Sequence, residues 1–253
     1  MKFEENAIVE SQNMIADGIF DMWITTCNIA EKAVPGQFIS VYTKDSSRLL
    51  PRPISICETD GNRLRIVYRV VGKGTKEFSE YKSGDSIRIL GPIGNGFPLF
   101  EGKKAILIGG GIGIPPMLEL SKRIYDSKEI VVGYRSKDTF LENDLKVYGN
   151  VTVATDDGSY GYHGTVIDAI KQAGIKGDVI YACGPTPMLR AIKEYAAQNN
   201  IEAWLSLEEK MACGIGACLA CVCKSAAIDE HSQVHNKRVC KDGPVFNAAE
   251  VEL

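Results

Sequence analysis

The side chains with the clearest chemical potential in this 253-residue chain are its eight cysteines, most of which are clustered. They stand at positions 27, 57, 183, 213, 218, 221, 223 and 240, so five of the eight fall between residues 213 and 240. A disulfide framework is typical of small secreted chains. Clustered cysteines in a longer chain indicate metal or redox chemistry instead.

The spacing of four of these cysteines is typical of one iron–sulfur centre. Cys213-x4-Cys218-x2-Cys221, followed later by Cys240, is the plant-type C-x4-C-x2-C…C pattern of a [2Fe–2S] cluster. Three thiolates must reach two irons from one tight loop, and the two glycines of the CGIGAC segment let the backbone approach closely because they have no Cβ. We therefore predict Cys213, Cys218, Cys221 and Cys240 as the cluster ligands.

Two other metal sites fit the same segment less well. A structural zinc site prefers paired short spacings of Cys or Cys and His, which one x4 gap, one x2 gap and a distant cysteine do not provide. A Rieske centre needs two His ligands, and His231 and His235 are not in step with any cysteine. Cys223 lies one position out of register, and we predict no ligand role for it.

Two glycine turns suggest a site for a nicotinamide nucleotide. AILIGGGIGIPPM combines a strand, a glycine loop that does not complete G-x-G-x-x-G, and a helix start, and YACGPTPM predicts a second strand–turn–helix unit. Open α/β sheets bind ligands at the carboxyl ends of such strands, where helix N-termini offer N–H groups to a pyrophosphate. The predicted nucleotide-binding residues are Gly110, Gly111, Gly113, Cys183, Gly184 and Pro185.

The second strand of this region does not distinguish NADH from NADPH. A carboxylate that binds the ribose is usual near its end. Tyr134, Arg135 and Ser136 stand there instead, so the choice of nucleotide stays open.

Two short segments in the first hundred residues suit a flavin nucleotide. RPISI is an extended segment in which Arg52 could pair with a phosphate and Ser55 could reach the polar edge of a flavin ring. VGKGT is a second turn, in which Gly74 and Thr75 are expected to expose N–H and hydroxyl donors. Neither segment is specific alone, since an arginine on a strand is often simply exposed.

The elements that must position these residues change along the chain. Up to about residue 98, short runs such as QFISVYT and RLRIVYRV are rich in β-branched and aromatic residues and indicate a small antiparallel barrel. In the second run, Leu64, Ile66 and Tyr68 share one face and Val67 lies on the other. After residue 99 strands alternate with helices, here PPMLELSKRIYD, GTVIDAIKQAG and PMLRAIKEYAAQNN, which predicts a parallel sheet.

The last segment, from 205 to 253, has a composition of its own. It contains a Cys/Gly loop, a polar stretch and VCKDGPVF. Because it has too little apolar material to form a core, we expect something other than a core to organise it.

The composition argues against several classes of protein. A net charge of -3 and a pI near 5.7 lack the basic surface that nucleic-acid binding needs. The apolar runs fall far short of the roughly 18 residues of a membrane span. The start, MKFEENAIVE, has acidic residues where a signal peptide is apolar. We therefore expect a cytoplasmic protein without a membrane or nucleic-acid partner.

Read together, RPISI, the GGGIGIPP and CGP turns, and the tail MACGIGACLACVC…VCKDGPVF resemble the ferredoxin-reductase superfamily. More closely, they resemble the electron-transfer subunits of B-type dihydroorotate dehydrogenase, over essentially the whole chain. The resemblance implies a multidomain α/β plus β protein with an FAD-binding β-barrel (1–98), a ferredoxin-reductase-like NAD-binding α/β domain (99–204) and a [2Fe–2S] domain (205–253). Carried over by motif, the FAD contacts would be Arg52, Pro53, Ile54, Ser55, Val67, Tyr68, Arg69, Gly74 and Thr75.

The resemblance also implies a partner and a function. The partner would be an FMN-containing catalytic subunit that oxidises dihydroorotate in pyrimidine biosynthesis, assembled with this chain in a heterotetramer. NAD(H) carries two electrons and a [2Fe–2S] cluster takes one at a time, so FAD would connect them. No catalytic acid or base is expected, which leaves His163 without a predicted role.

Two alternatives remain open at this point. One is a subunit of an NADH-dependent ferredoxin:NADP or sulfide/polysulfide oxidoreductase, which would share the fold and the cofactors. The other is a non-catalytic metal-binding or redox-sensing module that uses the same fold as a scaffold.

Overall fold

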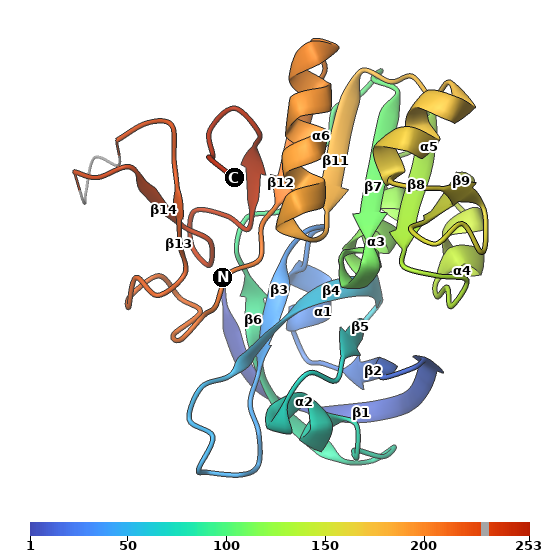
Figure 1. The fold of residues 1–253 in the computed structure, drawn as a ribbon. Helices are drawn as coiled ribbons and strands as arrows, with labels where there is room; N and C mark the ends of the chain where they lie inside the picture. The colour runs from blue at the N-terminus through green and yellow to red at the C-terminus, as the bar shows by residue number, and fades with distance from the viewer. Residues whose placement is uncertain (229–232) are drawn as a thin grey trace.

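The computed structural model describes residues 1–228 and 233–253. Figure 1 shows a barrel at one end of the molecule and a layered α/β part at the other. The C-terminal segment, coloured orange to red, lies along one side and contacts both parts.

The N-terminal part is a closed, six-stranded antiparallel barrel, as the sequence predicts. Its elements are β1 (Phe3–Ala16), β2 (Ile19–Thr25), α1 (Ile29–Lys32), β3 (Phe38–Val41), β4 (Arg52–Asp60), β5 (Arg63–Arg69), α2 (Lys73–Phe78) and β6 (Ser86–Ile93). The strand order is β1-β2-β5-β4-β3-β6, and pairing of β6 with β1 closes the barrel. The alternation predicted for β5 is confirmed, because Leu64, Ile66 and Tyr68 face the barrel core and Val67 faces the α/β part.

The second part is a parallel sheet covered on both faces, again as predicted. Its elements are β7 (Ala105–Gly110), the 3-10 turn η1 (Gly111–Gly113), α3 (Pro115–Arg123), β8 (Lys128–Tyr134), α4 (Glu142–Lys146), β9 (Asn150–Thr155), β10 (Tyr162–His163), α5 (Val166–Ala173), β11 (Val179–Cys183), α6 (Thr186–Gln198) and β12 (Glu202–Ser206). Ile106 and Ile108 face α5 and α6, whereas Leu107 faces α3 and α4. Burial on both faces explains why these strands are continuous apolar runs.

Local signals set the ends of the helices. Thr165 and Asp168 form a capping box at the start of α5, because each side chain binds the peptide N–H of the other. Gly174, at a φ of 63°, ends the same helix in a left-handed conformation. In the part of the chain that the structure describes, no helix has the length and apolar character needed to cross a membrane.

The order of the strands creates a switch point in the sheet. The order is β10-β9-β8-β7-β11-β12. Strands β8, β9 and β10 therefore follow β7 on one side of it, whereas β11 and β12 lie on its other side. Ligands of open α/β sheets bind at the carboxyl ends of strands at such a point. Here these ends are Gly110 and Cys183.

The C-terminal segment is more closely joined to the α/β part than its composition suggests. β13 (Val222–Lys224) and β14 (Asn236–Arg238) form a small hairpin, and β15 (Val245–Asn247) pairs antiparallel with β12 as a seventh strand of the sheet. Val239, Cys240 and Phe246 are buried in the apolar cluster that also contains α5 and α6. The segment therefore shares a core that its own residues could not form.

Candidate cofactor-binding sites

The predicted flavin residues lie where the pairing of two barrel strands ends. The ladder between β4 and β5 reaches Ile56 and Ile66 and stops there. Beyond this point Arg52–Ser55 pair with β3, and Val67–Arg69 pair with β2 on the other side. The facing edges of the two segments lie outside the ladder, so their peptide groups can be offered to a ligand.

The side chains of these segments differ in what they can contact. Pro53–Ser55 are half-buried, and Arg69 is exposed. Tyr68 is only 1% exposed, and its hydroxyl donates to Gln12 Oε1 at 2.7 Å inside the barrel. Val67 is also buried. Val67 and Tyr68 could therefore serve a flavin only through their peptide groups, whereas Arg69 can also offer its guanidinium.

Arg52 lies against the first turn of α2. A Cβ on Gly74 would be 2.3 Å from Arg52 Nε, so this glycine lets the guanidinium rest on the helix backbone. The Thr75 hydroxyl was expected to be exposed, but it is buried and accepts the N–H of Val71 at 2.9 Å. Thr75 therefore shapes the turn, while Arg52 supplies the positive charge that a phosphate needs.

The predicted nucleotide residues come together at the switch between β7 and β11. A Cβ on Gly113 would lie 2.4 Å from the carbonyl oxygen of Cys183. A Cβ on Gly110 would lie 2.4 Å from Met188 Sδ, and one on Gly184 would lie 2.3 Å from Met188 Cε. Gly113 is thus required by the close approach of the two turns, because its neighbour is backbone, whereas a Cβ at Gly110 or Gly184 would displace the flexible Met188 side chain.

This junction has the features of an anion-binding edge. Helix α3 begins at Pro115, and Pro185 is the N-cap of α6, so the first turns of both helices lie at the carboxyl ends of β7 and β11. Helix N-termini attract a pyrophosphate through their N–H groups and dipole. Burial raises the pKa of the Cys183 thiol to about 12, so this side chain is neutral at the junction.

The four predicted cluster ligands form two pairs of thiols. Cys218 Sγ accepts the N–H of Cys213 at 3.5 Å, and Cys221 Sγ accepts the N–H of Cys240 at 3.4 Å. Cys213 Sγ accepts two further loop N–H groups, at 3.3 and 3.5 Å. Peptide N–H groups directed at sulfur are among the features that tune an iron–sulfur cluster.

The two pairs differ in their environment. Burial and the neighbouring Cys221 thiol raise the pKa of Cys240 to about 12. Burial acts in the same direction on Cys213, but hydrogen bonds from the loop N–H groups and the Cys218 side chain prevail and lower its pKa to about 6. Within residues 1–228 and 233–253, no three His, Cys, Asp or Glu side chains are grouped to hold one metal ion. A [2Fe–2S] centre distributes four ligands over two irons, which two separate pairs suit.

The three predicted sites lie around the neighbouring strands β3, β4 and β5. We call residues 213–221, which carry three of the predicted ligands, the cluster loop. A Cβ on Gly214 would be 2.9 Å from Ser40 Oγ, so this loop touches β3, where Ser40 pairs with Pro53 of β4. The Gly111–Gly113 turn lies against β5. The cluster loop and the nucleotide turn therefore approach the flavin segments from the β3 side and from the β5 side.

Known proteins match this chain along its whole length. Residues 208–252 match the family model described as the iron–sulfur cluster binding domain of dihydroorotate dehydrogenase B. The chain is 46% identical over 254 residues to the dihydroorotate dehydrogenase B (NAD(+)) electron transfer subunit of Listeria innocua, with 97% of both chains covered. It is 42% identical to the subunit of that name from Geobacillus thermodenitrificans, with 98% of both covered. The chain belongs to this family.

A solved structure is similar to this chain over almost its whole length and supports the predicted fold. The NADH-dependent reduced ferredoxin-NADP oxidoreductase, solved to study flavin-based electron bifurcation, is 29% identical and has a TM-score of 0.88. The match covers 98% of this chain and 90% of that one. The ferredoxin-reductase-like fold and the resemblance carried by the motifs are therefore confirmed.

Sequence reasoning missed three residues beside the cluster loop: Arg238, Asp242 and Ser40. Arg238 donates to the carbonyl of Gly216 at 3.3 Å and pairs with Asp242 at 3.1 Å, which ties the loop to the turn that carries Cys240. No sequence signal indicated this contact, because residues 238–242 form the end of β14 and a turn, where helical spacing rules do not apply. Ser40, which lies under the loop, gave no signal, because only the fold brings it there.

The histidines and Cys223 lie apart from these contacts. His163 is exposed in β10, and His235 Nδ1 is 3.2 Å from the carbonyl oxygen of Ser225. His231 lies outside the described residues. Cys223 is half-buried in β13, and burial raises its pKa to about 11. That none of them takes part stays a prediction.

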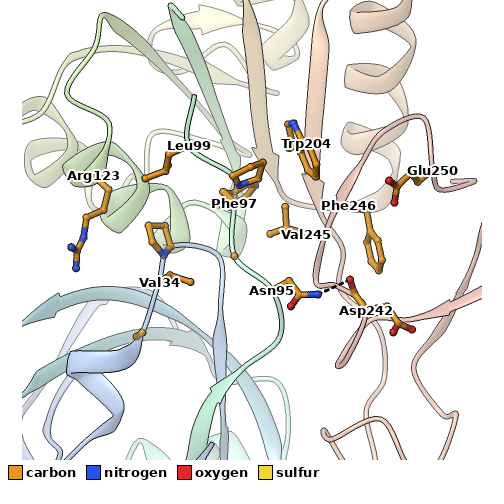
Figure 2. A pocket seen from close by; sticks show the side chains of 14 residues that line it. Val34, Asn95, Phe97, Leu99, Arg123, Trp204, Asp242, Val245, Phe246 and Glu250 are labelled. Carbon is orange, nitrogen blue, oxygen red and sulfur yellow. Dashed lines mark hydrogen bonds between the residues drawn. The ribbon is translucent and has the colours of Figure 1, made fainter. Parts of the chain in front are cut away.

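A groove of about 510 Å³ opens elsewhere, between the barrel, the 95–99 connection, β12 and the C-terminal segment. Figure 2 shows Phe97, Trp204 and Phe246 around it, with Asn95 Nδ2 donating to the carbonyl of Asp242 at 3.0 Å on one side. None of the predicted cofactor residues lines this groove. Its residues join the three parts of the chain, and the cofactor sites lie outside it.

Proposed function

We propose that this chain carries electrons between an FMN-containing dihydroorotate dehydrogenase catalytic subunit and NAD+ in pyrimidine biosynthesis, through a [2Fe–2S] cluster and FAD. The observation that carries the proposal is that the predicted flavin segments of β4 and β5 have the cluster loop on one side, at Ser40 of β3, and the nucleotide turn on the other, at β5. Electron transfer needs its centres held close together, and this geometry supports that order of cofactors.

The proposed ligands are those whose contacts are described above. Cys213, Cys218, Cys221 and Cys240 would hold the cluster. FAD would bind Arg52, Pro53, Ile54, Ser55, Val67, Tyr68, Arg69, Gly74 and Thr75. NAD(H) would bind Gly110, Gly111, Gly113, Cys183, Gly184 and Pro185. When bound, FAD links the two-electron chemistry of NAD(H) to the one-electron chemistry of the cluster.

Residues of the chain would supply a positive charge for FAD, two helix N-termini for NAD(H) and a neutral side chain beside the nicotinamide. Arg52 places a positive charge beside the Gly74 turn, where the phosphates of FAD would lie. The helix starts at α3 and α6 attract the pyrophosphate of NAD(H). Cys183 is neutral, so it can cover the nicotinamide ring without a charge that would draw in water.

The exposed end of the cluster loop is the proposed contact with the catalytic subunit. Ile215 and Leu219 are 47% and 52% exposed there, although both are apolar. Interface cores are rich in such residues and poor in charge. We propose that this chain and the catalytic subunit form a heterotetramer in the cytoplasm. Within this chain, we propose that residues 1–98 bind FAD, residues 99–204 bind NAD(H) and residues 205–253 bind the [2Fe–2S] cluster.

The test is reconstitution of the whole electron route. The anaerobic chain is mixed with the FMN-type dihydroorotate dehydrogenase subunit from the same source, and NAD+ reduction by dihydroorotate is followed by NADH absorbance. Activity should require both proteins, and Cys218→Ser should abolish it with loss of cluster absorbance. Cys223→Ser is the matched control, because this thiol lies outside the two pairs and should leave activity and colour unchanged.

The same experiment separates the alternatives. If NADH bleaches the flavin and cluster but dihydroorotate does not reduce NAD+, the chain is a reductase with another partner, such as a ferredoxin. The solved ferredoxin-NADP oxidoreductase favours that second candidate, but its 29% identity is well below the 46% shared with the Listeria innocua subunit. A colourless protein that binds neither flavin nor iron would instead favour a non-catalytic module.

A further inference from the structure

A buried carboxylate joins the α/β part to the barrel. Glu119, in the middle of α3, is 1% exposed. Its Oε2 accepts the N–H of Thr59 at 2.9 Å, and its Oε1 accepts the Thr59 hydroxyl at 3.1 Å. Thr59 lies near the end of β4, so both hydrogen bonds cross from one part of the molecule to the other.

Two basic residues of the same helix complete this contact. Arg123 Nε donates to Glu119 Oε1 at 2.7 Å and balances its charge. Lys122 Nζ donates to the carbonyl of Thr59 at 2.7 Å. Thr59 is therefore held through its N–H, its hydroxyl and its carbonyl, all by side chains of α3.

The two elements joined here carry cofactor residues at their other ends. Helix α3 follows directly on the Gly111–Gly113 turn, and β4 begins with Arg52–Ser55. The helix has nine residues and is about 13 Å long. β4 has a register shift between Ile56 and Glu58, so the helix is the stiffer of the two elements. Because Glu119 fixes this helix on β4, a shift there would displace the nucleotide turn relative to the flavin segment.

We propose that Glu119, held by Thr59 and Arg123, is a positioning residue that sets the distance between the nicotinamide and the flavin. The inference rests on the proposed function and adds a residue that takes no part in binding either cofactor. The nucleotide-binding turns belong to the α/β part and the flavin segments to the barrel, so each site is complete without Glu119. Its loss should slow electron transfer from NADH to the flavin while each cofactor still binds.

Other contacts keep the two parts together when Glu119 is changed. Arg65 of β5 pairs with Asp144 of α4 at 2.7 Å, and the apolar cluster that contains Val67 and Met117 also spans the junction. Small movements of the helix on the strand are therefore possible without separation of the two parts. A merely stabilising role would lower the melting temperature but would leave the rate in the folded protein unchanged.

The test uses Glu119→Gln in the FAD- and cluster-loaded chain. A carboxamide accepts through one oxygen only, so the hydrogen bonds from Thr59 and Arg123 cannot all be kept. Thr59→Val removes the hydroxyl alone and serves if Glu119→Gln does not fold, and Thr59→Ser should restore wild-type behaviour. Glu10→Gln is the matched control, because its 2.8 Å pair with Arg63 lies wholly within the barrel.

The measurements are the stopped-flow rate of flavin bleaching at saturating NADH, the Kd of NADH, and the charge-transfer absorbance of the nicotinamide–flavin pair. Glu119→Gln should slow bleaching by about 10-fold or more, since a misplacement of about 1 Å can cost on the order of 100-fold. The Kd should stay within about twofold, as expected for sites without shared partners. The charge-transfer band should weaken.

Three results would overturn the inference. Wild-type bleaching rates in both Glu119→Gln and Thr59→Val would show that the contact does not set the distance. Equal slowing in Glu10→Gln would show an effect of barrel charge in general. If the wild-type flavin itself is not reduced by NADH, the proposed function fails and this inference fails with it.

Discussion

Replacing Gly113 by alanine should weaken NADH binding without loss of the flavin or the cluster. A Cβ there would lie 2.4 Å from the carbonyl oxygen and 2.5 Å from the carbonyl carbon of Cys183, which pairing of β11 with β7 holds in place. The turn can relieve this overlap only by moving away from β11. Overpacking of this kind costs about 1–3 kcal/mol. Since about 1.4 kcal/mol is a factor of ten, the Kd of NADH should rise roughly 5- to 150-fold.

The assay is an anaerobic titration of flavin bleaching with NADH, with flavin and iron content measured on the same sample. Gly149→Ala is the control, because it lies in the same α/β part and the nearest atom to its new Cβ would be the flexible Lys128 Cγ at 3.3 Å. Its Kd should match the wild type. Equal NADH affinities for Gly113→Ala and Gly149→Ala would refute the placement of the nucleotide at this turn.

Three other experiments test the cluster loop, the ion pairs of Arg65 between the barrel and the α/β part, and the thiol of Cys183. Gly214→Ala should lower iron content, since its φ is +66° and its Cβ would meet Ser40 Oγ at 2.9 Å; Gly18→Ala, with a φ of +65° and open space, should not. Arg65→Met should lower the melting temperature, because Asp21 loses its partner and Glu58 keeps only its 3.5 Å pair with Lys122; breaking a buried pair costs about 3–5 kcal/mol. In apo-protein at about pH 8, iodoacetamide should spare Cys183 and modify exposed Cys27, as read by mass spectrometry. The pKa of Cys183 is raised to about 12, so at about pH 8 its thiolate fraction is roughly one in ten thousand and rises about tenfold with each pH unit; rapid labelling of Cys183 at about pH 8 would contradict this pKa.

Much of the fold could be predicted because its signals are local. The alternation at Leu64, Ile66 and Tyr68 is a property of a single strand, and it holds in the structure. The helices α3, α5 and α6 follow from their own periodicity and end signals. The short α4 and the role of Thr75 did not follow, because α4 has only five residues and the Thr75 hydroxyl binds peptide groups of Val71 and Gly72 in a turn that the sequence pattern did not specify.

Contacts between distant segments were the part that the sequence could not provide. Glu119 and Thr59 are 60 residues apart, and each is an ordinary polar residue in its own element. Ser40 and Gly214 are likewise unrelated in sequence, yet their contact brings the cluster loop to β3, the strand that pairs with the flavin segment of β4. Such contacts depend on how two elements pack against each other, and the sequence pattern within either element does not predict that packing.

The C-terminal segment depends on contacts of this kind for its structure. Its composition suggested that something other than a core organises it, but β15 is a strand of the main sheet, and Cys221 and Cys240 are 2% and 1% exposed in the core. Cys213 and Cys218 lie instead on a loop that reaches the surface. The two thiol pairs are thus unequal, because the core fixes one pair and the loop holds the other.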